Sequence, residues 1–247
     1  MSENLWAGLN PAARVQLETK SYAPQPLFQQ LATSGVPVGS LLDLDRSSAE
    51  VAEAWIPGVE IIPRKVFPQR HRGIFGEFGR KGEGIFGKIG FWPAQWATAR
   101  MDSGTAKGFH IHPPFIPENE DPAAWFQRLF GVDSNSTHFS LRPYDREQWD
   151  AMFFVQGQVE FFLVDERVGM PRRKMRLFIA GDNHRGADNA GIIIPAGVAH
   201  ALRGEGSEDL IMVYGTSTTF LPQNEGRLAS GVELASLPAD WDTYLNH

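Results

Sequence analysis

Short runs rich in apolar residues, and not a helical repeat, dominate the second half of the chain. Each run is four to six residues long, and the runs lie at 152–155, 159–164, 175–179, 191–194 and 210–214. Turn-forming residues separate them, whereas a βαβ arrangement would need long helices in between. Short strands at this spacing predict an all-β domain built as a sandwich or barrel.

The beginning of the chain has a different pattern, in which short helix-like patches are broken by proline and glycine. Ser47 and Glu50 have the spacing of a capping box, which predicts a helix at about 47–56. We therefore interpret residues 1–60 as a short helical N-terminal extension packed on a main domain of residues 61–247.

Glycine alternates with phenylalanine and isoleucine between residues 73 and 91. The sequence Gly-Ile-Phe-Gly occurs at 73–76 and again at 84–87. Because nothing longer recurs, we predict two neighbouring strands here rather than a structural repeat.

A proline-rich segment at 113–150 interrupts the β pattern. It contains Asp121 followed by Pro122, which is a good helix start because Asp caps the first turn and Pro suits the first helical position. The segment is predicted to be an insertion with one short helix. Long connections of this kind in compact domains are often functional.

The composition excludes several classes of protein. The 247 residues carry 23 basic and 29 acidic side chains, a net charge of −6, which argues against a nucleic-acid-binding protein. The absence of cysteine excludes disulfides, thiolate metal sites and a cysteine nucleophile. No apolar run approaches the roughly 18–20 residues of a membrane span, and the first residues lack the pattern of a secretory signal. A cytoplasmic protein with no membrane partner is expected.

Histidines occur in two patterns that suggest chemistry. His110 and His112 are two residues apart in an apolar stretch, and such residues point to the same face of a strand. His200 follows the apolar run 191–194 and a Pro-x-Gly turn.

The pair His-x-His and the later Pro-x-Gly-x-x-His resemble the two sequence motifs of the cupin superfamily. This resemblance implies a cupin-type jelly-roll β-barrel with the site inside the barrel. Metal-binding cupins commonly add a carboxylate shortly after the histidine pair, and Glu118 and Glu120 are the candidates here. Both glutamates follow the prolines that end the strand.

Within that superfamily, five blocks in order resemble the dTDP-4-dehydrorhamnose 3,5-epimerase family of sugar-nucleotide enzymes. The corresponding family patterns are Arg-Gly-x-Phe-x-Glu, Arg-Gly-Leu-His-Tyr-Gln, Gly-x-Val-x-Asp-x-x-Val-Asp-x-Arg, Ile-Pro-x-Gly-x-Ala-His, and a tyrosine-rich stretch ending in proline. In this chain the blocks lie at 72–77, 107–112, 157–167, 194–200 and 214–222.

The resemblance implies a role for each matching residue. His110 takes the position of the catalytic base that removes a proton alpha to the sugar ketone, a task suited to a group with a pKa near 6.5. The implied substrate-binding residues are Arg72 and Lys107 for the diphosphate, Phe75 and Glu77 for the nucleotide base, and His112, His200 and Tyr214 along the same pocket. The implied enzyme acts on a nucleotide-sugar and needs no cofactor.

Three positions depart from the family pattern. Thr219-Phe220 stands where the family has the tyrosine pair that supplies a general acid, and phenylalanine cannot donate a proton. Asp150 falls at about the position of the family lysine, where a carboxylate would oppose a developing oxyanion. His112 replaces the glutamine after the catalytic histidine.

Two other functions remain open on the sequence. In a metal-dependent cupin, an oxygenase or isomerase, His110, His112 and His200 would bind one divalent ion such as Fe, Zn, Ni or Mn. The missing tyrosine and lysine instead fit a non-catalytic sugar-binding cupin. A homodimer is predicted for the leading interpretation, both from the resemblance and from the β edges expected near residues 73–91.

Overall fold

The structure is a computed structural model, and it describes residues 52–53, 55–112, 148–167, 170–184, 186, 188–220 and 226–227. Most of the predicted extension 1–60 lies outside these ranges, as do Glu118 and Glu120. Of the helix predicted at 47–56, residues 52, 53, 55 and 56 are described, and the helix does not extend to 55 and 56. Residues 52 and 53 are helical. The predicted insertion 113–150 is described only at its end, where Asp150 already begins a strand.

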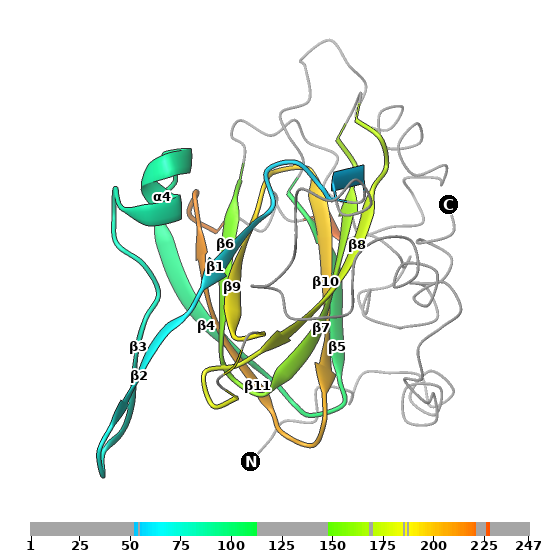
Figure 1. Cartoon of the computed structure of the whole chain (residues 1–247). Helices are drawn as coiled ribbons and strands as arrows, with labels where there is room; N and C mark the ends of the chain where they lie inside the picture. The colour runs from blue at the N-terminus through cyan, green and yellow to red at the C-terminus, as the bar shows by residue number, and fades with distance from the viewer. Residues whose placement is uncertain are drawn as a thin grey trace.

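Ten strands form two antiparallel sheets that face each other (Figure 1). The first has the order β1 (Glu60–Pro63), β9 (Ala190–Ile194), β6 (Asp150–Gln156), β11 (Leu210–Thr216) and β4 (Gln95–Met101). The second has the order β12 (Gly226–Arg227), β5 (Ala106–Ile111), β10 (Val198–Glu205), β7 (Gln158–Asp165) and β8 (Lys174–Ala180). The all-β jelly-roll prediction is confirmed, as two facing sheets rather than one continuous barrel. All five apolar runs predicted as strands are strands.

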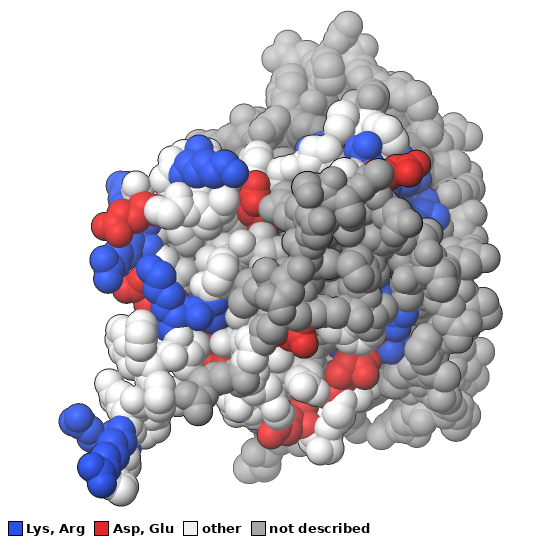
Figure 2. Space-filling model, in the orientation of Figure 1, with Lys and Arg blue, Asp and Glu red and all other residues white. Residues whose placement is uncertain are grey.

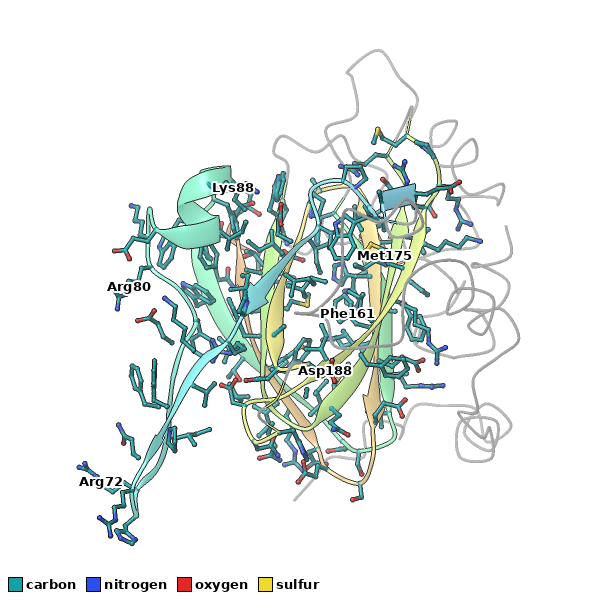
Figure 3. The ribbon with its side chains drawn as sticks, viewed as in Figure 1. Arg72, Arg80, Lys88, Phe161, Met175 and Asp188 are labelled. Atoms are coloured by element: carbon teal, nitrogen blue, oxygen red, sulfur yellow. The ribbon has the colours of Figure 1, made fainter. Side chains whose placement is uncertain are left out.

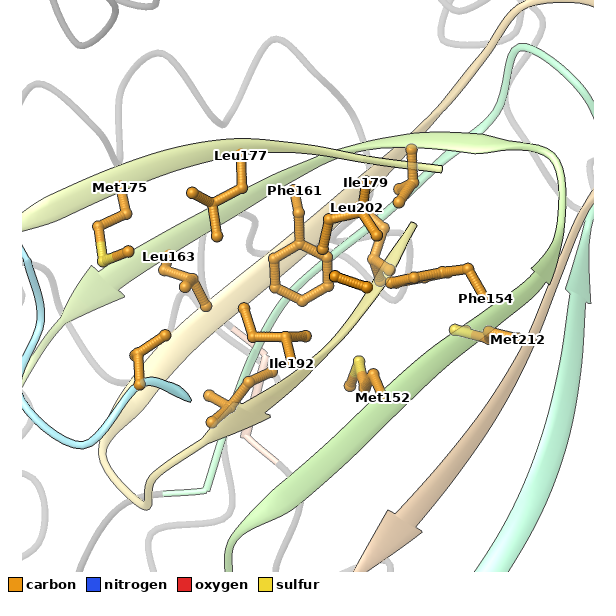
Figure 4. Close-up of a cluster of buried hydrophobic side chains, with 14 of the residues drawn as sticks. Met152, Phe154, Phe161, Leu163, Met175, Leu177, Ile179, Ile192, Leu202 and Met212 are labelled. Atoms are coloured by element: carbon orange, nitrogen blue, oxygen red, sulfur yellow. The ribbon is translucent and has the colours of Figure 1, made fainter. Parts of the chain in front are cut away.

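The hydrophobic core fills the space between the two sheets (Figure 4). Alternate residues of each strand point inward, because successive side chains of a strand face opposite sides. The first sheet contributes Met152, Phe154, Ile192 and Met212, and the second contributes Phe161, Leu163, Met175, Leu177, Ile179 and Leu202. Burying each such side chain contributes roughly 1.5–3 kcal/mol, so this layer fixes the strands that carry the site.

One predicted strand is a helix. Residues 84–87, expected to pair with 73–76, belong to α4 (Gly84–Ile89), which ends at Gly90 in the left-handed conformation with φ 68°. Phe86 is buried in an aromatic cluster on the outer face of the first sheet, with its ring 6.5 Å from that of Phe153. A helical turn lets this short Gly-rich segment bury Phe86 while its polar residues remain exposed.

The strand β3 (Gly73–Glu77) pairs with β2 (Lys65–Gln69) instead, in a hairpin that projects away from the two sheets (Figure 1). Its side chains Phe67, Ile74 and Phe75 are about half exposed. Lys and Arg side chains gather at its tip (Figure 2). An exposed hairpin with apolar side chains is a surface that proteins usually cover. Among the described residues, no helix has the length and apolar character that crossing a bilayer requires.

Candidate active site between the two sheets

A pocket lies between the two sheets and collects most of the residues singled out in the sequence. Its titratable lining side chains are Lys107, His110, His112, Asp150, His200 and Tyr214. In one sheet, β5 supplies Lys107 and His110, and β10 supplies His200, while His112 directly follows the last residue of β5. In the other sheet, β6 supplies Asp150 and β11 supplies Tyr214. The predicted common face of His110 and His112, and their approach to His200, are confirmed.

An irregular register in β5 brings Lys107 to the same pocket. Lys107 and His110 are three residues apart, so regular alternation would send them to opposite faces. The pairing with β10 shifts between His200, opposite His110, and Leu202, opposite Lys107. This shift places both side chains in the pocket.

Gly108 makes the irregularity possible. Its φ is 137°, a value that side-chain-bearing residues rarely adopt. A Cβ atom at this position would lie 2.6 Å from the Cα atom of Ala201. The glycine in Lys107-Gly108-Phe109-His110 therefore allows β5 to approach β10 closely.

The histidine rings form a stacked group on the wall made by β5 and β10. The centroid of the His200 ring lies 5.9 Å from that of His110 and 6.0 Å from that of His112. The His200 ring also stacks against that of Phe161, with the two centroids 6.4 Å apart. His110 is 9% exposed and His200 is 3% exposed, so the imidazoles are largely shielded from solvent.

Asp150 reaches this histidine wall from the opposite sheet. Its Oδ2 atom lies 3.4 Å from Nε2 of His112 and 3.8 Å from Nε2 of His200. The other carboxylate oxygen, Oδ1, accepts a hydrogen bond of 3.0 Å from Gln148, and Gln148 in turn accepts one of 2.8 Å from Thr218. The sequence placed Asp150 at the family lysine position but did not pair it with the histidines.

One sequence signal was available for Asp150. It lies two residues before the inward-facing Met152, and alternation in a strand turns both side chains toward the interior. The identity of its partners, however, depends on the strand facing it, which local sequence does not specify.

The tautomer of His200 follows from its neighbour. Its Nδ1 atom lies 3.4 Å from the carbonyl oxygen of Val198, which can only accept a hydrogen bond. In the tautomer with the proton on Nδ1, the ring donates to this carbonyl and Nε2 presents its lone pair toward Asp150.

The predicted nucleotide-binding residues Arg72, Phe75 and Glu77 lie outside this pocket. All three belong to the β2–β3 hairpin, and Arg72 is at its tip, far from the core residue Phe161 (Figure 3). The carboxylate of Glu77 accepts a hydrogen bond of 3.0 Å from Arg80, which lowers the pKa of Glu77. Within one chain, these residues and His110 do not form a common site.

The side chain of Phe220 does line the pocket. The position that the resemblance assigns to a proton-donating tyrosine is therefore occupied by a ring without a hydroxyl group. Among the pocket residues named above, Tyr214 is the one whose side chain carries a phenol hydroxyl group.

No protein-family model matches the chain, and no curated protein matches it in sequence. Among solved structures, the dTDP sugar isomerase from Desulfovibrio desulfuricans G20 is similar with a TM-score of 0.51 and 12% identity, over 74% of this chain and 90% of that chain.

Two further solved structures are similar over a slightly smaller share of the chain. The dTDP-6-deoxy-D-glucose-3,5-epimerase RmlC from Legionella pneumophila Philadelphia 1, in complex with dTDP-4-keto-L-rhamnose, has a TM-score of 0.48 and 17% identity, over 69% of this chain and 72% of that chain. ChmJ, a 3'-monoepimerase from Streptomyces bikiniensis in complex with dTDP-quinovose, has a TM-score of 0.49 and 20% identity, over 69% of each chain. At 12% identity, the likeness to the isomerase from Desulfovibrio desulfuricans shows the fold alone.

Proposed function

We propose that this protein is an epimerase or isomerase of a nucleotide-linked 4-keto sugar and that His110 is its base. The observation that carries the proposal is the pocket itself. It brings Lys107 and His110, from one block of the sequence, together with His200 from another, and Tyr214 lines it from the opposite sheet. The fold shared with a dTDP sugar isomerase is consistent with this substrate class.

The reaction exchanges a proton and needs no net oxidation or reduction. The base takes the proton from the carbon next to the ketone, and the electron pair of the C–H bond moves onto the ketone oxygen as an enolate. A proton then returns to the same carbon on its other face. An imidazole with a pKa near 6.5 suits the first step at neutral pH. Lys107 supplies a positive charge for the diphosphate.

The most direct test measures solvent exchange. The protein is incubated in D₂O with dTDP-4-keto-L-rhamnose, and mass spectrometry follows the recovered sugar nucleotide. We expect deuterium at carbons next to the ketone, at a rate that scales with protein concentration. Binding of the nucleotide-sugar without any exchange would contradict the proposal and favour the non-catalytic sugar-binding cupin.

Tyr214 is proposed as the acid that returns the proton, because it faces the pocket from the sheet opposite His110 and Phe220 has no proton to give. Tyr214→Phe is expected to lower epimer formation about 100-fold, within the usual range for a positioned acid. Deuterium should still enter the recovered substrate, since His110 is intact.

Met212→Leu is the matched control for Tyr214→Phe, because Met212 also lines the pocket from β11 and carries no proton donor. Its epimer formation should stay close to that of the wild type. Equal losses in both variants would show that packing, and not proton donation, explains the effect of Tyr214→Phe.

We also propose a homodimer in which the β2–β3 hairpin contacts a second copy. The exposed side chains of Phe67, Ile74 and Phe75 give the hairpin an apolar surface, and its basic tip carries Arg72. In a dimer, Arg72 and Glu77 would serve the pocket of the partner rather than their own. Light scattering at micromolar concentration should give twice the chain mass, and a monomer mass would contradict the dimer.

Mixing two inactive variants tests the exchange of residues between copies. His110→Ala and Arg72→Ala proteins, unfolded together and refolded, should form hybrids with one intact site. About a quarter of the wild-type site activity is expected at equal mixing, because half of the dimers are hybrids with one of two sites restored. The two variants mixed without refolding are the control, and equal activity before and after refolding would contradict the arrangement.

A further inference from the structure

We propose that His112, Asp150 and His200 bind one divalent transition-metal ion, with His110 outside the ligand set. One ligand atom from each of the three residues lies within 4.8 Å of the others. This set differs from the three histidines that the sequence suggested. It contains a carboxylate, that of Asp150, in place of the imidazole of His110.

The ligand atoms are close to the spacing that a metal requires. Ligands at about 2.0–2.1 Å from Zn²⁺ stand about 3.0–3.4 Å from one another. The distance from His112 Nε2 to Asp150 Oδ2 is 3.4 Å, and that from His200 Nε2 is 3.8 Å. The ligand atoms of His112 and His200 lie within 4.8 Å of each other, so an ion would have to draw the two imidazoles closer together.

Burial makes a cation favourable at this position. The side chains of Asp150 and His200 are each 4% exposed, and that of His112 is 13% exposed. A shielded carboxylate between two imidazoles has lost most of its hydration, so a positive charge bound to it recovers part of that free energy. Lys107 also lines the pocket, so the ion would share the site with one ammonium group.

Neighbouring groups hold the ligand atoms in orientations suited to a metal. Gln148, itself fixed by Thr218, binds Oδ1 of Asp150 and leaves Oδ2 directed at the histidines. The Val198 carbonyl beside Nδ1 of His200 leaves the lone pair of Nε2 for the ion. Metal-bound histidines and carboxylates typically have hydrogen-bonded partners of this kind.

The donor set indicates which metals fit. Two imidazoles and one carboxylate suit Fe²⁺, Co²⁺, Ni²⁺, Zn²⁺ or Mn²⁺, whereas Mg²⁺ and Ca²⁺ prefer sites made of oxygen. Three protein ligands leave positions open for water or substrate, as in catalytic metal sites.

The role of the ion rests on the proposed function. A lone carboxylate at Asp150 would oppose negative charge on the ketone oxygen. A divalent ion bound to that carboxylate would make the local charge next to the ketone oxygen positive, which would stabilise the enolate. Because His110 is outside the ligand set, the ion would not occupy the nitrogen that the proposed base uses.

Titration with Co²⁺ tests the site directly. The untagged full-length protein is treated with chelator, dialysed, and titrated with Co²⁺ in a calorimeter and a spectrophotometer, with no substrate present. We expect one equivalent to bind and to give the visible absorption of a protein-bound cobalt ion. Removing a residue that hydrogen-bonds to a metal ligand typically lowers metal affinity about 10–100-fold. Gln148→Ala should therefore weaken Co²⁺ binding about 10-fold, and Asp150→Asn, which removes a ligand itself, about 100-fold or more.

His184→Ala is the matched control. His184 Nε2 lies 2.7 Å from a carboxylate oxygen of Glu208, so it forms a histidine–carboxylate pair, but on the exposed surface. Its loss should leave Co²⁺ affinity unchanged. Loss of binding in this variant, or unchanged binding in Asp150→Asn, would overturn the site, as would a wild-type protein that binds no Co²⁺. If Asp150→Asn fails to fold, Gln148→Ala and His112→Gln give the same comparison.

The two proposals fail separately. Co²⁺ binding without deuterium exchange into any keto-sugar nucleotide would leave the metal site in place and overturn the proposed reaction. Exchange that proceeds fully in chelator-treated protein, together with absent Co²⁺ binding, would overturn the metal site and leave the reaction.

Discussion

Replacing His110 with alanine should reduce deuterium exchange into the keto-sugar nucleotide by about 10²–10⁴-fold, the range for removal of a positioned base. The ring of His110 is nearly parallel to that of His200, is 9% exposed, and lines the pocket beside Lys107. An alanine at this position leaves the pocket without the proton acceptor that the mechanism needs at the substrate. The exchange rate, measured by mass spectrometry at saturating substrate, checks this.

The structure should survive this change. The substitution empties part of an already polar pocket. The free energy of unfolding should therefore decrease by about 0.5–3 kcal/mol, the common range for a point mutation. His184→Ala, which removes an exposed histidine, is the control for unspecific loss of activity. Exchange at the wild-type rate in a folded His110→Ala protein would show that another group is the base.

Gly108→Ala should destabilise the protein by about 2–6 kcal/mol, because two costs add at one residue. A φ of 137° is strained for any residue with a Cβ atom, and such strain costs about 1–3 kcal/mol. The new methyl group would also meet the backbone of Ala201 at 2.6 Å, and overpacking of this kind costs about 1–3 kcal/mol. Urea unfolding followed by circular dichroism measures the change.

Gly206→Ala separates the two costs. Gly206 also has a positive φ, 76°, but no atom lies within 4 Å of a Cβ atom placed there. Its substitution should therefore cost only about 1 kcal/mol. Similar losses at both glycines would show that the close approach of β5 to β10 is not what requires Gly108.

The strands were predictable because their signal is local. Apolar runs such as 159–164 and 191–194 are short, end at turn-forming residues, and became β7 and β9. The period of two in a strand also determines that His110 and His112 share a face. These conclusions need only the chain and its covalent geometry.

The tertiary structure decided which residues meet. Residues 84–89 form a helix because Phe86 packs against an aromatic cluster that includes Phe153, far along the chain. A short Gly-rich apolar segment fits either a strand or a helix until its packing partners are known.

The site depended on the same long-range information. Asp150 lies beside His112 and His200 because two sheets face each other, and Arg72 lies apart because its hairpin projects from them. Sequence patterns determine the face a side chain points to, since that follows from local backbone geometry. They do not determine what stands opposite that face, because the partner comes from a distant strand whose position is set by the packing of the whole core.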